Sequence, residues 1–157
     1  MDKIERADVL GYEGKRVVVT GAATGMGAAT TKILLDLGAE VIAADIKKVD
    51  LPVKTFIEFD LRDKAGIERT VAAIPQGVDA VFSCAGVPGA PFSDIDSMLI
   101  NFIGQRYFIE LLVPKMSKGS AVAVIASPGG LGWQQNLGKM ISCHRNSTKQ
   151  LKFVLIF

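Results

Sequence analysis

The sequence predicts an α/β fold in which a doubly wound parallel sheet has helices on both faces. Short apolar runs alternate with longer segments of helical periodicity, a pattern typical of a parallel sheet covered on both sides. The first run, Val17–Val19, leads into the glycine-rich stretch Thr20–Gly27, and a helical segment follows. Right-handed crossovers then favour strand order 3-2-1-4-5. We therefore predict a Rossmann-type sheet that stops after its fifth strand.

The individual elements follow from apolar runs and from the residues that end them. Gly38 ends the first helix, and Pro75 lies just past the second, where a proline is common. The predicted strands are Arg16–Thr20, Glu40–Asp45, Lys54–Asp60, Val78–Cys84 and Ser120–Ala126. The predicted helices are Gly25–Leu37, Asp63–Ile74 and a long one from Asp96 or Ser97 to Met116.

The long helix is apolar over much of its circumference. A helix of this kind is buried on more than one side. One side should lie on the sheet, and the other needs a second helix or a second subunit, unless the segment is simply a well-covered core helix. The apolar residues are Leu99, Phe102, Ile103, Tyr107, Phe108, Ile109, Leu111, Leu112 and Val113.

Composition places the chain among globular proteins. Its 157 residues are 49% hydrophobic and 22% charged, which fits one domain with a sizeable core. No apolar run approaches the ~20 residues that cross a bilayer, and the start of the chain has no signal-peptide pattern. Cys84 and Cys143 have no metal-ligand spacing, so we expect no metal site and a cytoplasmic setting.

The last 19 residues differ from the rest. Residues 139–157 contain four lysines or arginines and no acid, whereas residues 1–138 are slightly acidic. We expect an NAD-binding domain at 1–138 and an atypical basic and apolar tail at 139–157. The basic residues are scattered without aromatic neighbours, so we expect neither a nucleic-acid nor a membrane partner. Fifth-strand residues would form a sheet edge unless Phe153–Phe157 adds as a strand beside them.

The glycine-rich turn is the strongest functional signal. Gly21 permits the tight turn, Gly25 lets the backbone approach a pyrophosphate, and Gly27 lets the helix pack close to the strand. The helix N-terminus then offers amide groups and a positive dipole end to the phosphates. This turn, with Thr24 and Met26 beside its glycines, predicts a dinucleotide site; a glycine-rich connection without a ligand is the alternative.

Asp45 adds a preference between cofactors. It ends the second predicted strand, where a carboxylate accepts hydrogen bonds from the adenosine ribose hydroxyls and repels a 2′-phosphate. The residue therefore favours NAD over NADP, although Lys47 and Lys48 lie close in sequence. The alternative is an acid that is merely solvated at a strand end.

The glycine-rich turn is the first of six short segments that follow one another along the chain. They are TGAATGMG, Asp45, FDLRD with Asp60, SCAG at Ser83–Gly86, INFIG with Asn101 and VIASPGG with Ser127. As a set, in this order and spacing, they resemble the short-chain dehydrogenase/reductase family over residues 14–136. Within that family the CAGVPG and ASPGGLGW segments resemble bacterial hydroxysteroid and aromatic or terpene alcohol dehydrogenases.

The resemblance implies roles for further residues. Asp60 would meet the adenine amino group with Leu61 beside it, and Ala85 and Gly86 would lie against the cofactor. Asn101 would hold the water of a proton relay, unless it is bonded locally within its helix. Ser127 would donate to the substrate carbonyl oxygen, unless it only caps a strand end. The family usually has Asn-Asn-Ala-Gly where this chain has Ser-Cys-Ala-Gly, which weakens a tie between central strands.

One family feature has no match. The catalytic tyrosine and lysine of the family form a Tyr-x-x-x-Lys after the serine, and both tyrosines here, Tyr12 and Tyr107, precede Ser127. His144, Ser147 and Lys149 cannot replace that pair. The resemblance implies an NAD-dependent oxidoreductase acting on an alcohol or ketone, homo-oligomeric in its full-length parent. The alternatives are a catalytically silent nucleotide-binding fragment, and an interaction protein that docks through its tail.

Overall fold

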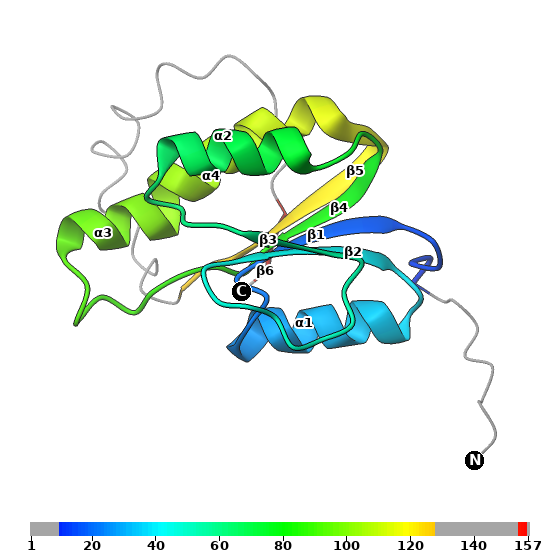
Figure 1. The fold of residues 1–157 in the computed structure, drawn as a ribbon, viewed down its shortest axis with the longest axis horizontal. Helices are drawn as coiled ribbons and strands as arrows, with labels where there is room; N and C mark the ends of the chain where they lie inside the picture. Colours follow the sequence, from blue (N-terminus) through cyan, green and yellow to red (C-terminus); the bar gives the residue numbers. More distant parts are fainter. Residues whose placement is uncertain (1–9, 128–153, 157) are drawn as a thin grey trace.

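A six-stranded parallel sheet runs through the centre of the protein, in the order β3-β2-β1-β4-β5-β6 (Figure 1). The computed structural model describes residues 10–127 and 154–156. The strands are β1 (Arg16–Thr20), β2 (Glu40–Asp45), β3 (Thr55–Glu58), β4 (Val78–Ser83), β5 (Met116–Ile125) and β6 (Val154–Ile156). The helices are α1 (Gly25–Asp36), α2 (Lys64–Ala73), α3 (Asp94–Met98) and α4 (Gly104–Leu112), with a π-helical segment η1 (Leu99–Ile103) and a 3-10 turn η2 (Val113–Lys115).

The predicted strand order 3-2-1-4-5 is confirmed. A sixth strand adds to it, because β6 pairs in parallel with β5 and places Leu155 opposite Val124. This is the alternative that the sequence left open, in which part of Phe153–Phe157 covers the outer edge of the fifth strand. The proposed domain boundary at residue 138 lies outside the described residues.

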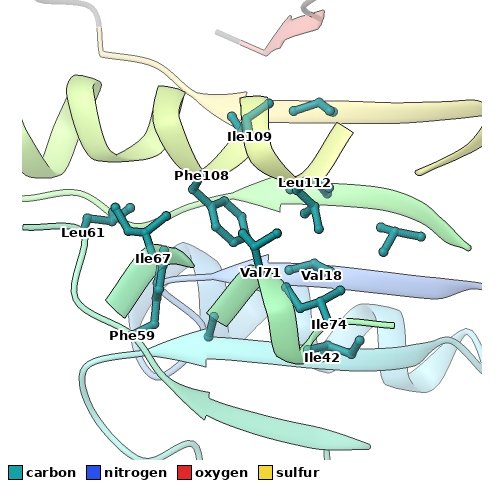
Figure 2. Packing of buried hydrophobic residues seen from close by; sticks show 14 residues of the cluster. Val18, Ile42, Phe59, Leu61, Ile67, Val71, Ile74, Phe108, Ile109 and Leu112 are labelled. Atoms are coloured by element: carbon teal, nitrogen blue, oxygen red, sulfur yellow. The ribbon is translucent and has the colours of Figure 1, made fainter. Parts of the chain in front are cut away.

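The helices form two layers around the sheet. Helices α2 and α4 cover one face and α1 covers the other (Figure 1). Because side chains alternate along a strand, Val18 packs under α2 and α4 while Val17 and Val19 pack with Leu34 of α1. In Figure 2, Phe108 and Leu112 of α4 point into the larger cluster, and the Phe108 ring lies 5.0 Å from that of Phe59. The continuous apolar runs of the central strands are thus explained by burial on both faces.

The first two helices match their predicted bounds within one residue. Gly38, at φ +80°, follows α1, and its amide donates to the Leu35 carbonyl while the Ala39 amide donates to the Leu34 carbonyl. This is the hydrogen-bond pattern of a Schellman C-cap. Asp63 stands at the N-cap of α2.

The predicted single long helix was wrong at both ends and in its middle. It starts earlier, at Asp94, because the Ser93 hydroxyl caps it by accepting from the Asp96 amide at 3.0 Å. Its middle widens into the π-helical η1. It ends in η2, which contains Pro114, and Met116 is the first residue of β5 rather than the last of the helix.

The fifth strand is longer than predicted, Met116–Ile125 in place of Ser120–Ala126. Its pairing with β4 shifts register between Val78 and Ala80, where Met116 faces the first and Ala121 the second. Gly119 lies in this irregular stretch at φ +84°, a backbone conformation that other residues rarely adopt. The irregularity lets the chain leave η2 and still join the regular ladder. The third and fourth predicted strands extend one or two residues too far at their carboxyl ends.

Only part of the predicted apolar helix is buried. Phe108 and Leu112 of α4 are fully buried, whereas Phe102 and Ile103 of η1 are 52% and 49% exposed. Helix α4 therefore has the second covering element that was expected, because α2 packs beside it on the same face of the sheet. The apolar side chains of η1 have no such cover among the described residues.

These two phenylalanines give a matched test of the packing. We expect Phe108→Ala to lower the free energy of unfolding by roughly 3–5 kcal/mol, because it leaves a cavity against Phe59. Phe102→Ala should cost about 1 kcal/mol or less, since its ring is half exposed already. Urea unfolding measures both, and equal losses for the two variants would contradict the packing described.

Candidate nucleotide-binding site

A cleft of about 420 Å³ opens at the carboxyl ends of the central strands. Open parallel sheets bind ligands at this edge, where the strand order reverses on either side of β1. All ten residues that the sequence analysis assigned to a cofactor line the cleft: Gly21, Thr24, Gly25, Met26, Gly27, Asp45, Asp60, Leu61, Ala85 and Gly86. The structure brings together segments that are up to 65 residues apart.

At the floor of the cleft, the backbone at Gly21 lies very close to the backbone at Gly27 and at Ala85. A Cβ on Gly27 would lie 1.9 Å from the Gly21 carbonyl oxygen, and a Cβ on Gly21 would lie 2.6 Å from the Ala85 backbone. Gly21 also has φ +70°. No side chain fits at either position. The predicted roles of these glycines in the turn and in helix packing therefore have a direct geometric basis.

The N-terminus of α1 faces the same cleft and offers unused amide groups. Its N-cap, Thr24, makes no side-chain capping bond, and the first turn contains no acid. A Cβ on Gly25 would meet nothing within 4 Å, so that side of the turn is open space. An anion placed there would meet amide donors and the positive end of a 12-residue helix.

Asp45 is held in a fixed orientation at the rim. The side chain is buried, with 9% exposed, and each of its oxygens accepts a backbone hydrogen bond. One oxygen accepts from the Ala23 amide at 2.9 Å, and the other accepts from the Lys47 amide at 2.8 Å. The carboxylate thus ties the end of β2 to the glycine-rich turn. It is not a freely solvated strand-end acid, which was the alternative.

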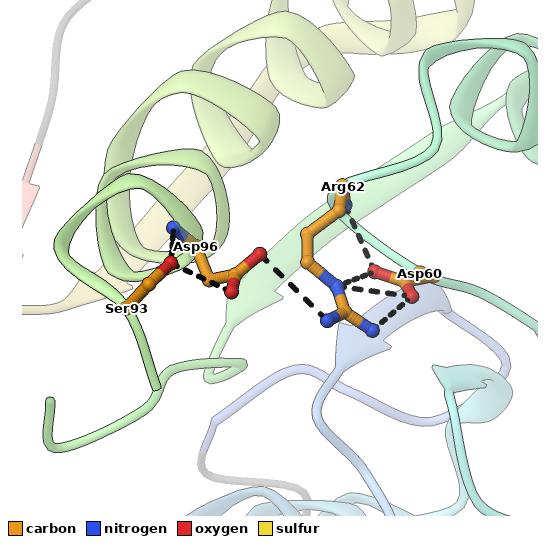
Figure 3. A network of polar contacts seen from close by, with 4 residues as sticks. All are labelled: Asp60, Arg62, Ser93 and Asp96. Carbon is orange, nitrogen blue, oxygen red and sulfur yellow. Dashed lines mark hydrogen bonds and ion pairs between the residues drawn. The ribbon is translucent and has the colours of Figure 1, made fainter. Parts of the chain in front are cut away.

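Asp60 forms the opposite end of the cleft together with Arg62. Figure 3 shows the Arg62 guanidinium lying between Asp60 and Asp96. Its Nη2 donates to Asp60 Oδ2 at 2.7 Å and its Nε to Oδ1 at 3.0 Å, while Nη1 lies 3.8 Å from Asp96 Oδ1. These hydrogen bonds hold the pKa of the Asp60 carboxyl below its usual range. Arg62 links this end of the cleft to the start of α3.

Sequence reasoning missed Arg62. Its signal was its place in FDLRD, two residues after Asp60. There the Arg62 amide donates to Asp60 Oδ1 at 2.9 Å, and this tight turn brings the Arg62 side chain to the same carboxylate. Nothing in the sequence indicated the second contact, with Asp96, because α3 was predicted to begin later.

Asn101 lies in η1 and clamps the segment that follows β4. Its Nδ2 donates to the Val87 carbonyl and its Oδ1 accepts from the Val87 amide, both at 2.8 Å. Val87 lines the cleft, whereas Asn101 is exposed and is not among the lining residues. π-Helical turns are often found at functional sites. The side chain is therefore engaged with a distant backbone segment rather than with its own helix, and a role in holding water stays a prediction.

Two further residues singled out from the sequence differ in where they lie relative to the cleft. Ser127 follows β5, is exposed, and does not line the cleft. Cys84 does line it, and burial raises the pKa of its thiol, as expected for a small packed residue rather than a nucleophile. Cys143, His144, Ser147 and Lys149 lie outside the described residues.

The part of the chain that the structure describes contains neither a metal-binding cluster nor a membrane-spanning helix. Within residues 10–127 and 154–156, no three histidine, cysteine or acidic side chains gather in a way that could hold a metal ion. Among the same residues, no helix is long and apolar enough to cross a membrane.

Comparison with known proteins gives one consistent family. The family model for short chain dehydrogenases matches residues 15–137. A coniferyl-alcohol dehydrogenase of Pseudomonas is 30% identical over 123 residues, covering 78% of this chain and 48% of the relative. A 3-alpha-hydroxysteroid dehydrogenase/carbonyl reductase of Comamonas testosteroni is 28% identical over 110 residues, covering 69% of this chain and 42% of that relative. The chain thus spans about half the length of these curated relatives.

Solved structures agree on the fold. A short chain dehydrogenase of Leptospira borgpetersenii, determined with bound NAD⁺, superposes with a TM-score of 0.66 at 17% identity. The match covers 84% of this chain and 59% of that one.

The Asp60–Arg62 pair gives a pH-dependent prediction. A carboxyl whose pKa is lowered by folding contributes stability above its unfolded pKa of about 3.9, and this stability is lost as the pH falls through the folded value. We expect Arg62→Ala to raise the pKa of Asp60 toward its ordinary value, and to flatten the loss of stability on acidification. Carboxyl NMR titration with urea unfolding at several pH values measures both.

Arg69 provides the control for this test. Its guanidinium pairs with Asp63 at 3.0 Å and does not contact Asp60. Arg69→Ala should leave the Asp60 titration unchanged. An Asp60 pKa that stays low in Arg62→Ala would show that another group controls it.

Proposed function

This chain belongs to the short chain dehydrogenase family, and on that premise we propose that its cleft binds NAD(H) for hydride transfer between the nicotinamide and a secondary alcohol or ketone. The observation that supports this most directly is the cleft itself, in which the glycine-rich turn, the N-terminus of α1, Asp45 at the end of β2 and Asp60 just after β3 converge. NAD(H) would supply or accept the hydride when bound. The chain's own residues would bind and orient it.

The cleft residues fit a dinucleotide in order along the sheet edge. The α1 N-terminus beside Gly25 would hold the pyrophosphate. Asp45 would accept hydrogen bonds from the adenosine ribose, and Asp60 with Leu61 would contact the adenine. Ala85 and Gly86 would form the wall on the nicotinamide side. This assignment follows the family pattern and is consistent with the lining of the cleft.

The orientation of Asp45 supports NAD over NADP. A 2′-phosphate on the ribose would approach a carboxylate that two backbone amides already hold in place. The charge cannot rotate away without breaking both bonds. Lys47 contacts Asp45 through its backbone amide and contributes no side-chain contact to this carboxylate.

The tyrosines within the described residues are not placed for proton transfer in the cleft. Tyr107 donates its hydroxyl to Glu68 at 2.5 Å on the α2–α4 surface, and that bond raises its pKa. Tyr12 packs near the Phe82 ring, at 6.3 Å. A family acid–base group needs a lowered pKa and a place beside the nicotinamide.

We propose that Ser127 polarises the substrate oxygen and Asn101 supports the proton relay in a complete enzyme.

The substrate class is proposed from the relatives' names. One relative is a coniferyl-alcohol dehydrogenase and another a hydroxysteroid dehydrogenase and carbonyl reductase. A cyclic or aromatic-ring alcohol or ketone is therefore our proposed substrate. A catalytically silent nucleotide-binding protein remains the second candidate, favoured by the lack of any tyrosine after Ser127 in the 157 residues.

We also propose that a longer protein containing this chain is a homo-oligomer. Exposed apolar side chains on α3 and η1 support this: Ile95 is 74% exposed, Met98 53% and Phe102 52%. Such a patch is typical of a surface that another element or subunit covers.

The cofactor preference can be measured by calorimetry. We expect NADH to bind at least about tenfold more tightly than NADPH, a difference of about 1.4 kcal/mol. Asp45→Asn should narrow the gap, because it removes the charge and keeps a carbonyl acceptor for the ribose. Asp45→Ala should also narrow the difference in affinity between NADH and NADPH, and it should weaken the binding of both cofactors. NADPH binding as tight as NADH to the unaltered chain would rule out the assigned role of Asp45.

Catalysis by the 157-residue chain should be slow even with NAD bound. Hydride transfer to a carbonyl leaves an alkoxide that has to be protonated, and general acid–base catalysis is typically worth ~10²–10⁴-fold. We expect no NADH formation near an enzyme's usual ~10 per second with a panel of cyclic secondary alcohols. Calorimetry on the same sample establishes that NAD is bound. Turnover at the usual rate would require an acid–base group that the described cleft does not contain.

A further inference from the structure

The Ser83-Cys84-Ala85-Gly86 turn has no side-chain amide of its own, but the side-chain amide of a residue in α4 bonds to it. Gln105, the second residue of α4, is 6% exposed and reaches the end of β4. Its Oε1 accepts from the Ser83 hydroxyl at 3.0 Å, and its Nε2 donates to the Ala85 carbonyl. We propose that Gln105 is a positioning residue that fixes the Ala85–Gly86 wall of the cleft, in place of the asparagine that the family usually has at residue 83.

The contacts of Gln105 belong to a closed ring of hydrogen bonds. The Ala85 amide donates to Thr20 Oγ1 at 3.4 Å, and the Thr20 hydroxyl donates to Ser83 Oγ at 3.5 Å. The Ser83 hydroxyl donates to Gln105, which returns a bond to Ala85. Each hydroxyl accepts one bond and donates one, so the donor directions are consistent around the ring. The ring thus starts at the backbone amide of Ala85 and ends at the backbone carbonyl of the same residue.

The ring is buried, and its two hydroxyls are paired within it. Thr20 and Ser83 are 0% and 1% exposed. Polar groups at such depth are costly without partners, and removing one member leaves the others unsatisfied. Loss of the Gln105 amide would remove the acceptor of the Ser83 hydroxyl proton and the side-chain donor to the Ala85 carbonyl. The turn would keep its bonds to Thr20 and the Asn101 bonds to Val87, but the Ala85 carbonyl would lose its tie to α4.

The position of Ala85 makes the ring matter for binding. Ala85 and Gly86 line the cleft, and the Ala85 backbone also presses against Gly21 of the glycine-rich turn. Holding Ala85 by both its amide and its carbonyl therefore fixes the distance between two walls of the site. The effect on ligand binding rests on the proposed dinucleotide function, whereas the effect on Ala85 itself does not.

Two matched substitutions on α4 test this role. Gln105→Met keeps the length of the side chain and removes its amide, and Leu112→Ala destabilises the same helix from a fully buried position outside the ring. The measurements are amide hydrogen exchange at Ala85 by NMR without ligand, and NAD affinity by calorimetry. We expect faster Ala85 exchange and about tenfold weaker NAD binding for Gln105→Met. Leu112→Ala should lower overall stability without changing NAD affinity under folding conditions.

A rescue variant separates positioning from general stability. Ser83→Asn in the Gln105→Met background places an amide where the family has one, and we expect it to restore Ala85 protection and most of the NAD affinity. Unchanged Ala85 exchange in Gln105→Met, or equal loss of NAD affinity in Leu112→Ala, would overturn the proposal. If the unaltered chain does not bind NAD, the proposed function fails, and the exchange and rescue measurements still decide the role of Gln105.

Discussion

The site depends on the contact of three backbone segments at Gly21. The end of β1, the first turn of α1 and the turn after β4 meet there so closely that a Cβ on Gly21 or Gly27 would overlap neighbouring backbone. Because these segments touch without side chains between them, the α1 N-terminus and the Ala85–Gly86 wall have a fixed separation. The cleft is the space that remains beside this contact, at the carboxyl edge of the sheet.

Polar contacts then fix the walls of the cleft relative to that centre. Asp45 ties β2 to the glycine-rich turn, and Asn101 and Gln105 tie the segment after β4 to the helical layer. Arg62 joins the loop after β3 to α3. Side chains that could bind a ligand are thus held by the protein itself. A site with this degree of internal bonding pays less of its ordering cost when it binds.

Most of the fold could be predicted because its signals are local. Apolar runs, the glycine-rich turn and Gly38 determine strands and helix ends from nearby residues. The long helix could not be predicted in detail, because its start depends on the Ser93 cap and its middle on the unusual π-helical turn. The ten residues proposed to bind a cofactor were named from the glycine-rich turn, from Asp45 and from the family resemblance, and the structure gathers them in one cleft. Arg62 and Gln105 were missed, since their partners lie in other elements and only the folded chain brings them together.

At Ser83 the chain lacks the asparagine that the family usually has, and we expected a weaker tie between the central strands. The Thr20 hydroxyl bonds to Ser83 between β1 and β4, and Gln105 adds a bond to Ser83 from α4. The same reasoning does not extend to the missing tyrosine and lysine, because no group lining the cleft has the chemistry of a tuned phenol.

The central claim is that the cleft at the carboxyl edge binds a dinucleotide. A titration of ¹⁵N-labelled chain with NAD⁺, followed by amide chemical shifts, tests it most directly. If NAD⁺ binds there, the largest shift changes should fall on Gly21–Gly27, on Asp45 and Asp60, and on Ala85 and Gly86. Amides at the opposite edge, such as Gly77 and Gly119, should be unaffected. Changes centred on that opposite edge, or no saturable change at all, would contradict the account.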